Sequence, residues 1–153
     1  MVSHTAFGPS SLSDHDVLHA ERAIGPIPDA LLAIYRRQNG GVMERSLFVS
    51  DAGDDYGMEY LLPVPEGGLE PAEQDIVRVN TALQREQLIP ADHLAFGMDG
   101  GDNYFSVARS DGSVWYHPLD TWEEDWSPAE NHARTMEQLS DSVAGFFDNL
   151  TEP

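Results

Sequence analysis

Hydrophobic residues spaced three and four positions apart predict a short amphipathic helix at residues 28–41. Its apolar stripe consists of three residues that share one helical face: Leu31, Ile34 and Tyr35. This spacing is typical of a helix that buries a single face. The segment opens on proline, which suits the first helical position because its missing N–H would be unpaired there. At the other end, Gly40 or Asn39 can adopt the left-handed conformation that closes a helix.

The same periodicity predicts another helix immediately before it, at residues 14–23. Its apolar face is formed by Val17, Leu18, Ala20 and Ile24. Ser13 is a typical N-cap, and Asp16 three positions later completes the pattern of a capping box. A Gly-Pro pair at 25–26 interrupts the helix. We therefore expect the chain to begin its fold with a pair of helices joined by a short turn.

Beyond residue 41 the hydrophobic runs shorten to a length typical of strands. Predicted strands lie at 47–49, 56–64, 94–96, 104–108 and 113–117. Prolines at 63 and 65 end the second of them, and the last two form a hairpin. A third helix is predicted at 71–88, where Ile76, Val79 and Leu83 recur at helical spacing.

The last part of the chain predicts one more helix after an irregular connection. Residues 122–134 are acidic and aromatic without a clear period, and Ser140 then caps a helix with an apolar face of Val143, Phe146, Phe147 and Leu150. The order of helices and strands favours an α+β fold with a mostly antiparallel sheet, one inserted helix and a C-terminal helix. We expect residues 1–10 to be a flexible leader and residues 11–153 to form one domain.

Composition agrees with a single folded domain. The chain has 153 residues, of which 41% are hydrophobic and 9% aromatic, so one core can bury roughly 70% of the unfolded surface. There is no cysteine, which excludes a disulfide framework and a cysteine nucleophile. Neither a signal-like start nor a run of about 20 apolar residues occurs. We expect a cytoplasmic protein that is a monomer or a weak homodimer.

Charge is the outlying property of the composition. Eight basic residues, all of them arginine, stand against 27 acidic ones, and the formal net charge is -19. Such a field repels nucleic acid and anionic membranes, so neither is an expected partner. It would steer a basic partner toward the protein. The alternative interpretation is that the charge serves only solubility.

Two segments concentrate the acidic residues. Between Arg45 and Arg78 the chain has eight acidic residues and no basic one, and from this stretch we single out Asp51, Asp54, Asp55 and Glu59 as candidate partner-binding residues. Further along, Trp122, Glu123, Glu124, Asp125 and Trp126 combine aromatic and acidic side chains, as an interface anchor does. The competing interpretations are a solvated surface for the first segment and indoles that cover the core for the second.

Two other groups of residues suggest chemistry less strongly. Asp99 and Asp102 flank a Gly-Gly pair, where they could bind a cation or a partner guanidinium or accept local backbone N–H bonds in a turn. His15 and His19 have the spacing of a zinc-protease helix but lie opposite Val17, and the sequence offers no third ligand. No phosphate-binding motif or catalytic triad can be assembled. We therefore predict no metal site and no cofactor.

A series of short motifs follows in order along the chain: Glu21-x-x-Ile24-Gly25, Ile27-Pro28, Asn39-Gly40-Gly41, Leu88-Ile89-Pro90, Phe96-Gly97, Gly100-Gly101-Asp102-Asn103-Tyr104, Asp111-Gly112-Ser113-Val114-Trp115-Tyr116-His117 and a Phe-rich final helix. In this order the motifs resemble the SUKH superfamily, which includes the fungal Smi/Knr cell-wall regulators and bacterial toxin-immunity proteins.

The resemblance implies a binding domain without catalytic residues, in bacteria most often an immunity protein that neutralises a toxin. Many such toxins are nucleases, whose active surfaces are basic because they hold phosphates. A basic toxin domain is therefore the expected partner, bound through the acidic and aromatic residues named above. The alternative that the resemblance leaves open is a regulatory or scaffolding domain that binds an endogenous protein. A metal-dependent hydrolase that uses His15 and His19 is a third possibility.

Overall fold

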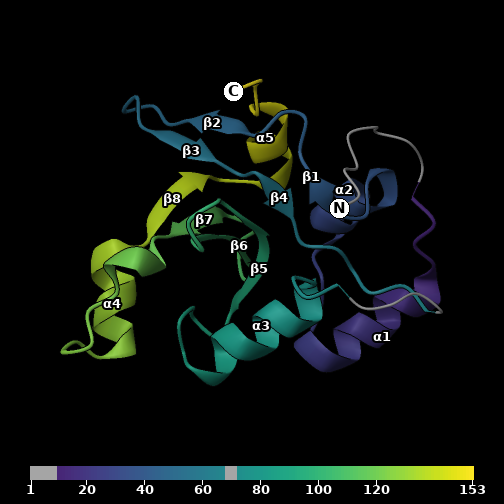
Figure 1. Ribbon diagram of the computed structural model, residues 1–153, viewed down its shortest axis with the longest axis horizontal. Helices are drawn as coiled ribbons and strands as arrows, with labels where there is room; N and C mark the ends of the chain where they lie inside the picture. The colour runs from purple at the N-terminus through teal and green to yellow at the C-terminus, as the bar shows by residue number, and fades with distance from the viewer. Residues whose placement is uncertain (1–9, 68–71) are drawn as a thin grey trace.

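A six-stranded antiparallel sheet forms the centre of the fold in the computed structural model (Figure 1), which describes residues 10–67 and 72–153. Its strand order is β1-β4-β5-β6-β7-β8. The strands are β1 (Gly41–Val42), β4 (Tyr60–Leu61), β5 (His93–Met98), β6 (Tyr104–Ala108), β7 (Val114–His117) and β8 (Glu137–Ser140). A separate hairpin pairs β2 (Leu47–Val49) with β3 (Asp55–Gly57).

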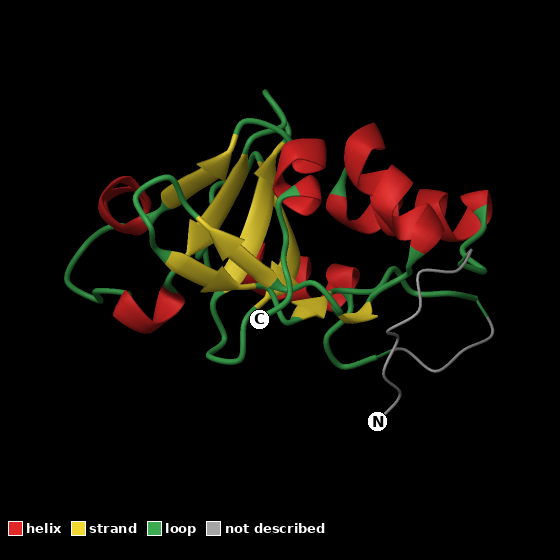
Figure 2. Ribbon diagram, turned by 90° about the horizontal axis from the view of Figure 1, so that it is seen from above, coloured by secondary structure: helices red, strands yellow, loops and turns green. Residues whose placement is uncertain are grey.

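Helices surround the sheet and include an N-terminal pair. They are α1 (Asp14–Ile24), α2 (Asp29–Arg37), α3 (Ile76–Arg85), α4 (Pro128–Thr135) and α5 (Val143–Asp148), with a 3-10 turn at Leu119–Thr121. Two perpendicular views place α4 at the opposite end of the molecule from α1, with the strands between them (Figures 1 and 2). The predicted α+β class with a mostly antiparallel sheet is confirmed.

Helix α1 forms where its capping signals predict. Ser13 Oγ accepts the backbone N–H of Asp16 at 3.1 Å, while Asp16 Oδ2 accepts the backbone N–H of Ser13 at 3.2 Å. This reciprocal pair is the predicted capping box. Leu18 is nevertheless 47% exposed, because it lies about 100° around the helix from Val17, at the edge of the apolar stripe.

The Asn39-Gly40 pair has a different role from the one predicted. Helix α2 ends at Arg37 and its C-cap, Gln38, is extended, so neither residue of the pair closes the helix. Asn39 instead exchanges two hydrogen bonds with the backbone of Val64, at 2.9 and 2.8 Å. Gly40 has φ +83°, and a Cβ there would lie 2.6 Å from Pro63 Cα. The pair joins the end of α2 to the chain beyond β4.

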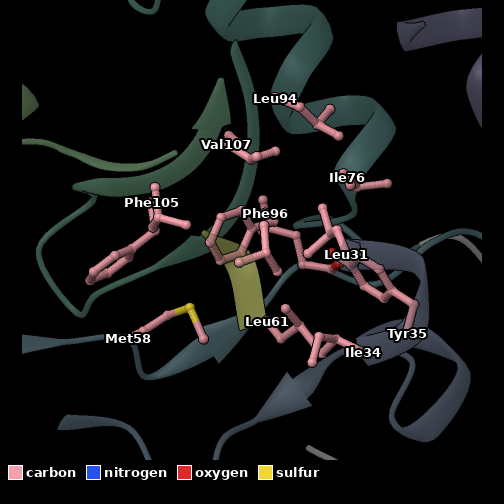
Figure 3. Packing of buried hydrophobic residues seen from close by; sticks show 14 of the residues in the cluster. Leu31, Ile34, Tyr35, Met58, Leu61, Ile76, Leu94, Phe96, Phe105 and Val107 are labelled. Atoms are coloured by element: carbon pink, nitrogen blue, oxygen red, sulfur yellow. The ribbon is translucent and has the colours of Figure 1, made fainter. Parts of the chain in front are cut away.

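The core lies between the sheet and the helices α1, α2, α3 and α5. Leu31 and Tyr35 of α2 are completely buried, together with Phe96 and Phe105 of neighbouring strands (Figure 3). The Tyr35 hydroxyl donates to the carbonyl of Leu62 at 2.6 Å, which satisfies the only polar group of that side chain. The Phe146 ring of α5 packs on both phenylalanines, at centroid distances of 6.0 and 5.8 Å.

Helix α3 is shorter than predicted. One of its side chains forms hydrogen bonds with the backbone of β5. It begins at Ile76 because Asp75 caps it, accepting the backbone N–H of Arg78 at 2.8 Å; the predicted start at residue 71 lies outside the described residues. Asn80 exchanges two 2.8 Å hydrogen bonds with the N–H and carbonyl of Ala95. The pairing of β5 with β4 covers only Gly97 and Met98 of β5. The Asn80 amide therefore takes the place of a neighbouring strand at Ala95.

Other predicted boundaries are wrong for identifiable reasons. The predicted strand 56–64 is two strands in different sheets, because the chain crosses at Met58. The N–H of Met58 donates to the carbonyl of Ser46, just before β2, while the N–H of Glu59 donates to the carbonyl of Met98 in the large sheet. The predicted irregular connection 122–134 becomes helical from Pro128, where α4 begins. This helix has no apolar stripe to reveal it, since Asn131 is its buried residue. Ser140 lies in β8, and Ser142 caps α5.

The sequence analysis did not predict β1 or β8. Strand β1 has two residues, and β8 is an edge strand whose residues are exposed or half-buried. Neither shows the hydrophobic alternation by which strands are recognised. Of the predicted leader at 1–10, residues 1–9 lie outside the described residues. Within residues 10–67 and 72–153, no helix is both long and apolar enough to cross a membrane.

Candidate protein-binding surface

Two tyrosines connect acidic residues that are far apart in the sequence. The rings of Tyr56 on β3 and Tyr116 on β7 pack edge to face with centroids 5.0 Å apart. The Tyr56 hydroxyl donates to Glu137 on β8 at 3.0 Å, and the Tyr116 hydroxyl donates to Asp99 at 2.6 Å. The β2–β3 hairpin therefore lies alongside β8 (Figure 1), and Glu137 and Asp99 place carboxylates on both sides of the tyrosine pair.

The tyrosine hydroxyls sit among negative charges. Burial, the hydrogen bond to Glu137 and the charges of Glu137 and Asp54 raise the pKa of Tyr56 to about 12. Burial, the hydrogen bond to Asp99 and the charges of Asp99 and Asp120 raise the pKa of Tyr116 as well. Both hydroxyls therefore stay protonated at neutral pH and donate to carboxylates.

Asp99 is the structural centre of the β5–β6 turn. Its Oδ1 accepts the N–H groups of Gly101 and Asn103 at 2.8 and 3.1 Å, and its Oδ2 accepts the Asn103 side-chain amide at 3.2 Å. Burial raises the pKa of Asp99, but the hydrogen bonds from Tyr116, Gly101 and Asn103 outweigh burial and hold it below its usual range. The local N–H bonds that the sequence allowed are present, and the carboxylate stays ionised.

Other carboxylates adjoin this turn. A Cβ at Gly100 would lie 2.7 Å from Glu59 Oε2, so Glu59 lies directly over the turn. Asp102 is exposed, with φ +60°, a conformation that aspartate tolerates better than most residues. Asn103 Oδ1 accepts the backbone N–H of Asp120 at 3.1 Å. This bond places the 3-10 turn at Leu119–Thr121 beside the β5–β6 turn.

We name this region the tyrosine-centred acidic surface, defined by Asp54, Asp55, Glu59, Asp99, Asp102, Asp120 and Glu137. All are exposed except Asp99, which is half-buried. None of them belongs to an ion pair among the described residues. The six exposed carboxylates therefore direct their charge to solvent or to a partner, whereas both oxygens of Asp99 accept hydrogen bonds within the fold. Five of the seven were predicted partner-binding residues, whereas Asp120 and Glu137 were not.

Asp51 lies apart from these residues. It is exposed at the tip of the β2–β3 hairpin, on the rim of a hollow that it shares with residues 138–141 at the end of β8.

The tryptophan-containing segment forms a second acidic cluster, on the loop that precedes α4. Its backbone is held by the buried amide of Asn131, which exchanges two 2.9 Å hydrogen bonds with Glu123. Trp122 packs edge to face on His132 at 5.9 Å, and the Arg134 guanidinium lies 4.4 Å from the Trp126 ring.

Both indoles of this segment are half-buried, whereas the acidic residues between them, Glu123, Glu124 and Asp125, are exposed. The indoles thus hold the loop against α4, and the carboxylates face outward.

Sequence reasoning missed a buried polar network on the sheet. Ser106 Oγ on β6 lies 2.8 Å from His93 Nδ1 and 2.6 Å from His117 Nε2. One hydroxyl can donate to one ring and accept from the other. His117 Nδ1 is buried without a partner among the described residues. Ser106 is 0% exposed and His117 1% exposed, so this serine and this histidine are closed to a substrate.

The burial of His117 predicts a loss of stability at low pH. Burial lowers the pKa of His117 to about 3 from its ordinary value of 6.5, with His93 and His132 acting in the same direction. As the pH falls, the unfolded chain binds a proton at this histidine before the folded chain does. The stability gained from the neutral His117 is therefore complete above about pH 6.5 and is lost progressively as the pH falls toward 3. Between about pH 7.5 and pH 5.5, wild type should lose about 1 kcal/mol more unfolding free energy than His117→Gln in urea titrations.

The control for this prediction is His15→Gln, at an exposed histidine of α1. This variant should follow wild type over the same pH interval. Equal pH dependence of wild type and His117→Gln would contradict a buried neutral histidine.

Residues suited to metal binding do not cluster in the described part of the chain. His15 and His19 are exposed on α1, as predicted. Within residues 10–67 and 72–153, no group of three or more histidine, aspartate or glutamate side chains is arranged to hold a metal ion.

The fold and surface define a class of protein: an α+β domain with an N-terminal helix pair, an antiparallel sheet and an exposed acidic surface. The chain belongs to the SMI1 / KNR4 family (SUKH-1), whose model matches residues 11–149. The family includes immunity proteins and fungal regulators, and its members are generally non-catalytic binding domains. No curated protein matches the chain.

Proposed function

We propose that this protein is a cytoplasmic immunity protein that neutralises a basic toxin domain by stoichiometric binding, without catalysis. The observation that carries the proposal is the tyrosine-centred acidic surface, whose carboxylates have no ion-pair partner among the described residues. Family membership supports a protein as the ligand.

The proposed mechanism is electrostatic occlusion. A toxin that acts on nucleic acid needs a basic surface to hold phosphates. Carboxylates on the tyrosine-centred acidic surface would pair with those lysines and arginines and occupy the place of the phosphates. The hydrogen bonds of Asp99 and the packing of Tyr56 on Tyr116 hold part of this surface in position before binding, which reduces the entropy lost on association.

The alternative is a regulatory or scaffolding domain with an endogenous partner, since the family includes fungal regulators. Genomic position separates the two proposals. A toxin gene immediately upstream favours immunity, whereas an isolated housekeeping context favours regulation.

Co-expression with the product of a neighbouring toxin gene tests the proposed function. The immunity proposal predicts restored growth and a 1:1 complex in size-exclusion chromatography. Persistent toxicity together with no complex at low ionic strength would contradict it.

A further inference from the structure

A cavity of about 340 Å³ lies between α2, α5 and the chain that follows β1. Its apolar walls are formed by Ile34, Met43, Leu61, Phe147 and Leu150. Figure 3 shows Ile34 and Leu61 close together at the margin of the core. This volume is at the lower end of the range for small-ligand sites, which is enough for one apolar side chain with its adjoining backbone.

A buried side-chain amide in the wall of this cavity has an oxygen that accepts no hydrogen bond from the described residues. Gln38 is 4% exposed, and its Nε2 donates to the carbonyl of Gly40 at 3.1 Å. The carbonyl of Val42 lies 3.5 Å from the same nitrogen. These two carbonyls fix the amide orientation, because a flipped amide would place two acceptors against each other.

Gln38 Oε1 is consequently left without a partner among the described residues. A buried acceptor without a hydrogen bond is unfavourable, so a ligand N–H at this position would be stabilising. The first property of the ligand is therefore a hydrogen-bond donor beside an apolar group.

Charged residues at the cavity supply the second property. Arg37 and Arg45 both line it and are exposed. Neither belongs to an ion pair of the described residues, although acidic residues far outnumber arginines in this chain. Three acids line the same cavity: Glu44, Asp148 and Glu152. The cavity thus offers sites for one carboxylate and for a cationic group beside it.

We propose that this cavity binds the carboxyl-terminal residue of a protein chain, an apolar residue preceded by a basic one. The side chain of the terminal residue packs between the apolar walls. The backbone N–H of this residue donates to Gln38 Oε1, and its carboxylate pairs with Arg37 and Arg45. The preceding basic residue meets Glu44, Asp148 or Glu152. A chain terminus combines a donor, an apolar group and a carboxylate in one residue, which an internal segment does not.

This inference rests on the proposed function only in taking a protein as the ligand. The cavity adjoins the tyrosine-centred acidic surface, since the N–H of Met43 donates to the carbonyl of Glu59 at 3.1 Å. One partner could therefore contact both regions.

The test uses two synthetic peptides, acetyl-Gly-Arg-Leu with a free carboxylate and the same peptide with a terminal amide, titrated into the ¹⁵N-labelled full chain. We expect the free acid to shift the backbone resonances of Gln38, Met43 and Leu150, and the amide form to bind about tenfold more weakly. Shifts absent with both peptides, or equal affinity for both, would overturn the inference.

Arg45→Gln sharpens the test because the residue is exposed and its loss leaves the core intact. This variant should bind the free acid about tenfold more weakly and the amide form unchanged. Arg85→Gln, an exposed arginine at the end of α3, is the control and should bind both peptides like wild type. Equal effects of Arg45→Gln on the two peptides would contradict a carboxylate contact.

The two proposals can fail separately. A protein that neutralises the toxin but binds neither peptide would overturn the cavity inference alone. A protein that binds the free-acid peptide selectively but forms no toxin complex would support the cavity inference and overturn the proposed function.

Discussion

Reversing two carboxylates of the β2–β3 hairpin, in the variant Asp54→Arg with Asp55→Arg, should slow association with a basic toxin domain at least about tenfold at low ionic strength. Both side chains are exposed, and Asp54 lies close enough to Tyr56 for its charge to raise the pKa of that hydroxyl. The free energy of unfolding should change by about 0.5 kcal/mol or less, because neither forms an ion pair within the described residues. Stopped-flow association kinetics and urea denaturation measure the two effects.

The control must separate local charge from net charge. Glu73→Arg with Glu86→Arg changes the net charge equally, at exposed positions before and after α3. This variant should slow association much less than the hairpin variant. Equal slowing by both would mean that the overall field, and no particular surface, steers the partner.

The same reversal at Glu123 and Glu124 tests the second acidic cluster. Both residues are exposed on the loop held by Asn131, and we expect slower association here too. Unchanged kinetics with both pairs reversed would place the interface elsewhere.

Gly40→Ala should lower the free energy of unfolding by about 3 kcal/mol. A β-carbon at this position would lie 2.5 Å from Pro63 Cβ and 2.6 Å from Pro63 Cα, and the residue has φ +83°. The contact is with backbone, so it cannot be relieved by turning a flexible side chain. Relief would require α2 and the chain beyond β4 to separate, which would also stretch the two hydrogen bonds between Asn39 and Val64.

Gly53→Ala is the matched control for this prediction. Gly53 has φ +89°, but an added Cβ would meet nothing within 4 Å. Its cost should be the conformational part alone, about 1 kcal/mol. Urea denaturation of the two variants separates the clash from the backbone preference. Equal destabilisation would show that the close approach of Gly40 to Pro63 contributes nothing.

Local signals explain which parts of the fold the sequence predicts. The Ser13 capping box and the stripe of Leu31, Ile34 and Tyr35 are short-range patterns, and both appear as expected. Strand β8 and helix α4 carry no such pattern, because their residues are mostly polar or exposed. Their positions depend on contacts with distant segments, such as the pairing of β8 with β7.

The candidate surface depends even more on tertiary contacts. Charge alone indicated Asp54 and Asp99, but it could not show that the packing of Tyr56 on Tyr116 brings these two residues to one surface. Glu137 and Asp120 join the surface only through hydrogen bonds across the fold. Part of the buried network around Ser106 could have been predicted from the sequence. The expected hairpin of β6 and β7 pairs Ser106 with Trp115, two residues from His117.

The central claim is that the acidic surface binds and neutralises a basic toxin domain. Its most direct test is the association rate of the purified toxin domain with this protein at ionic strengths from about 20 to 200 mM. The account predicts a 1:1 complex whose association rate falls by about tenfold or more over that range. An association rate independent of salt, or no complex at the lowest ionic strength, would contradict it.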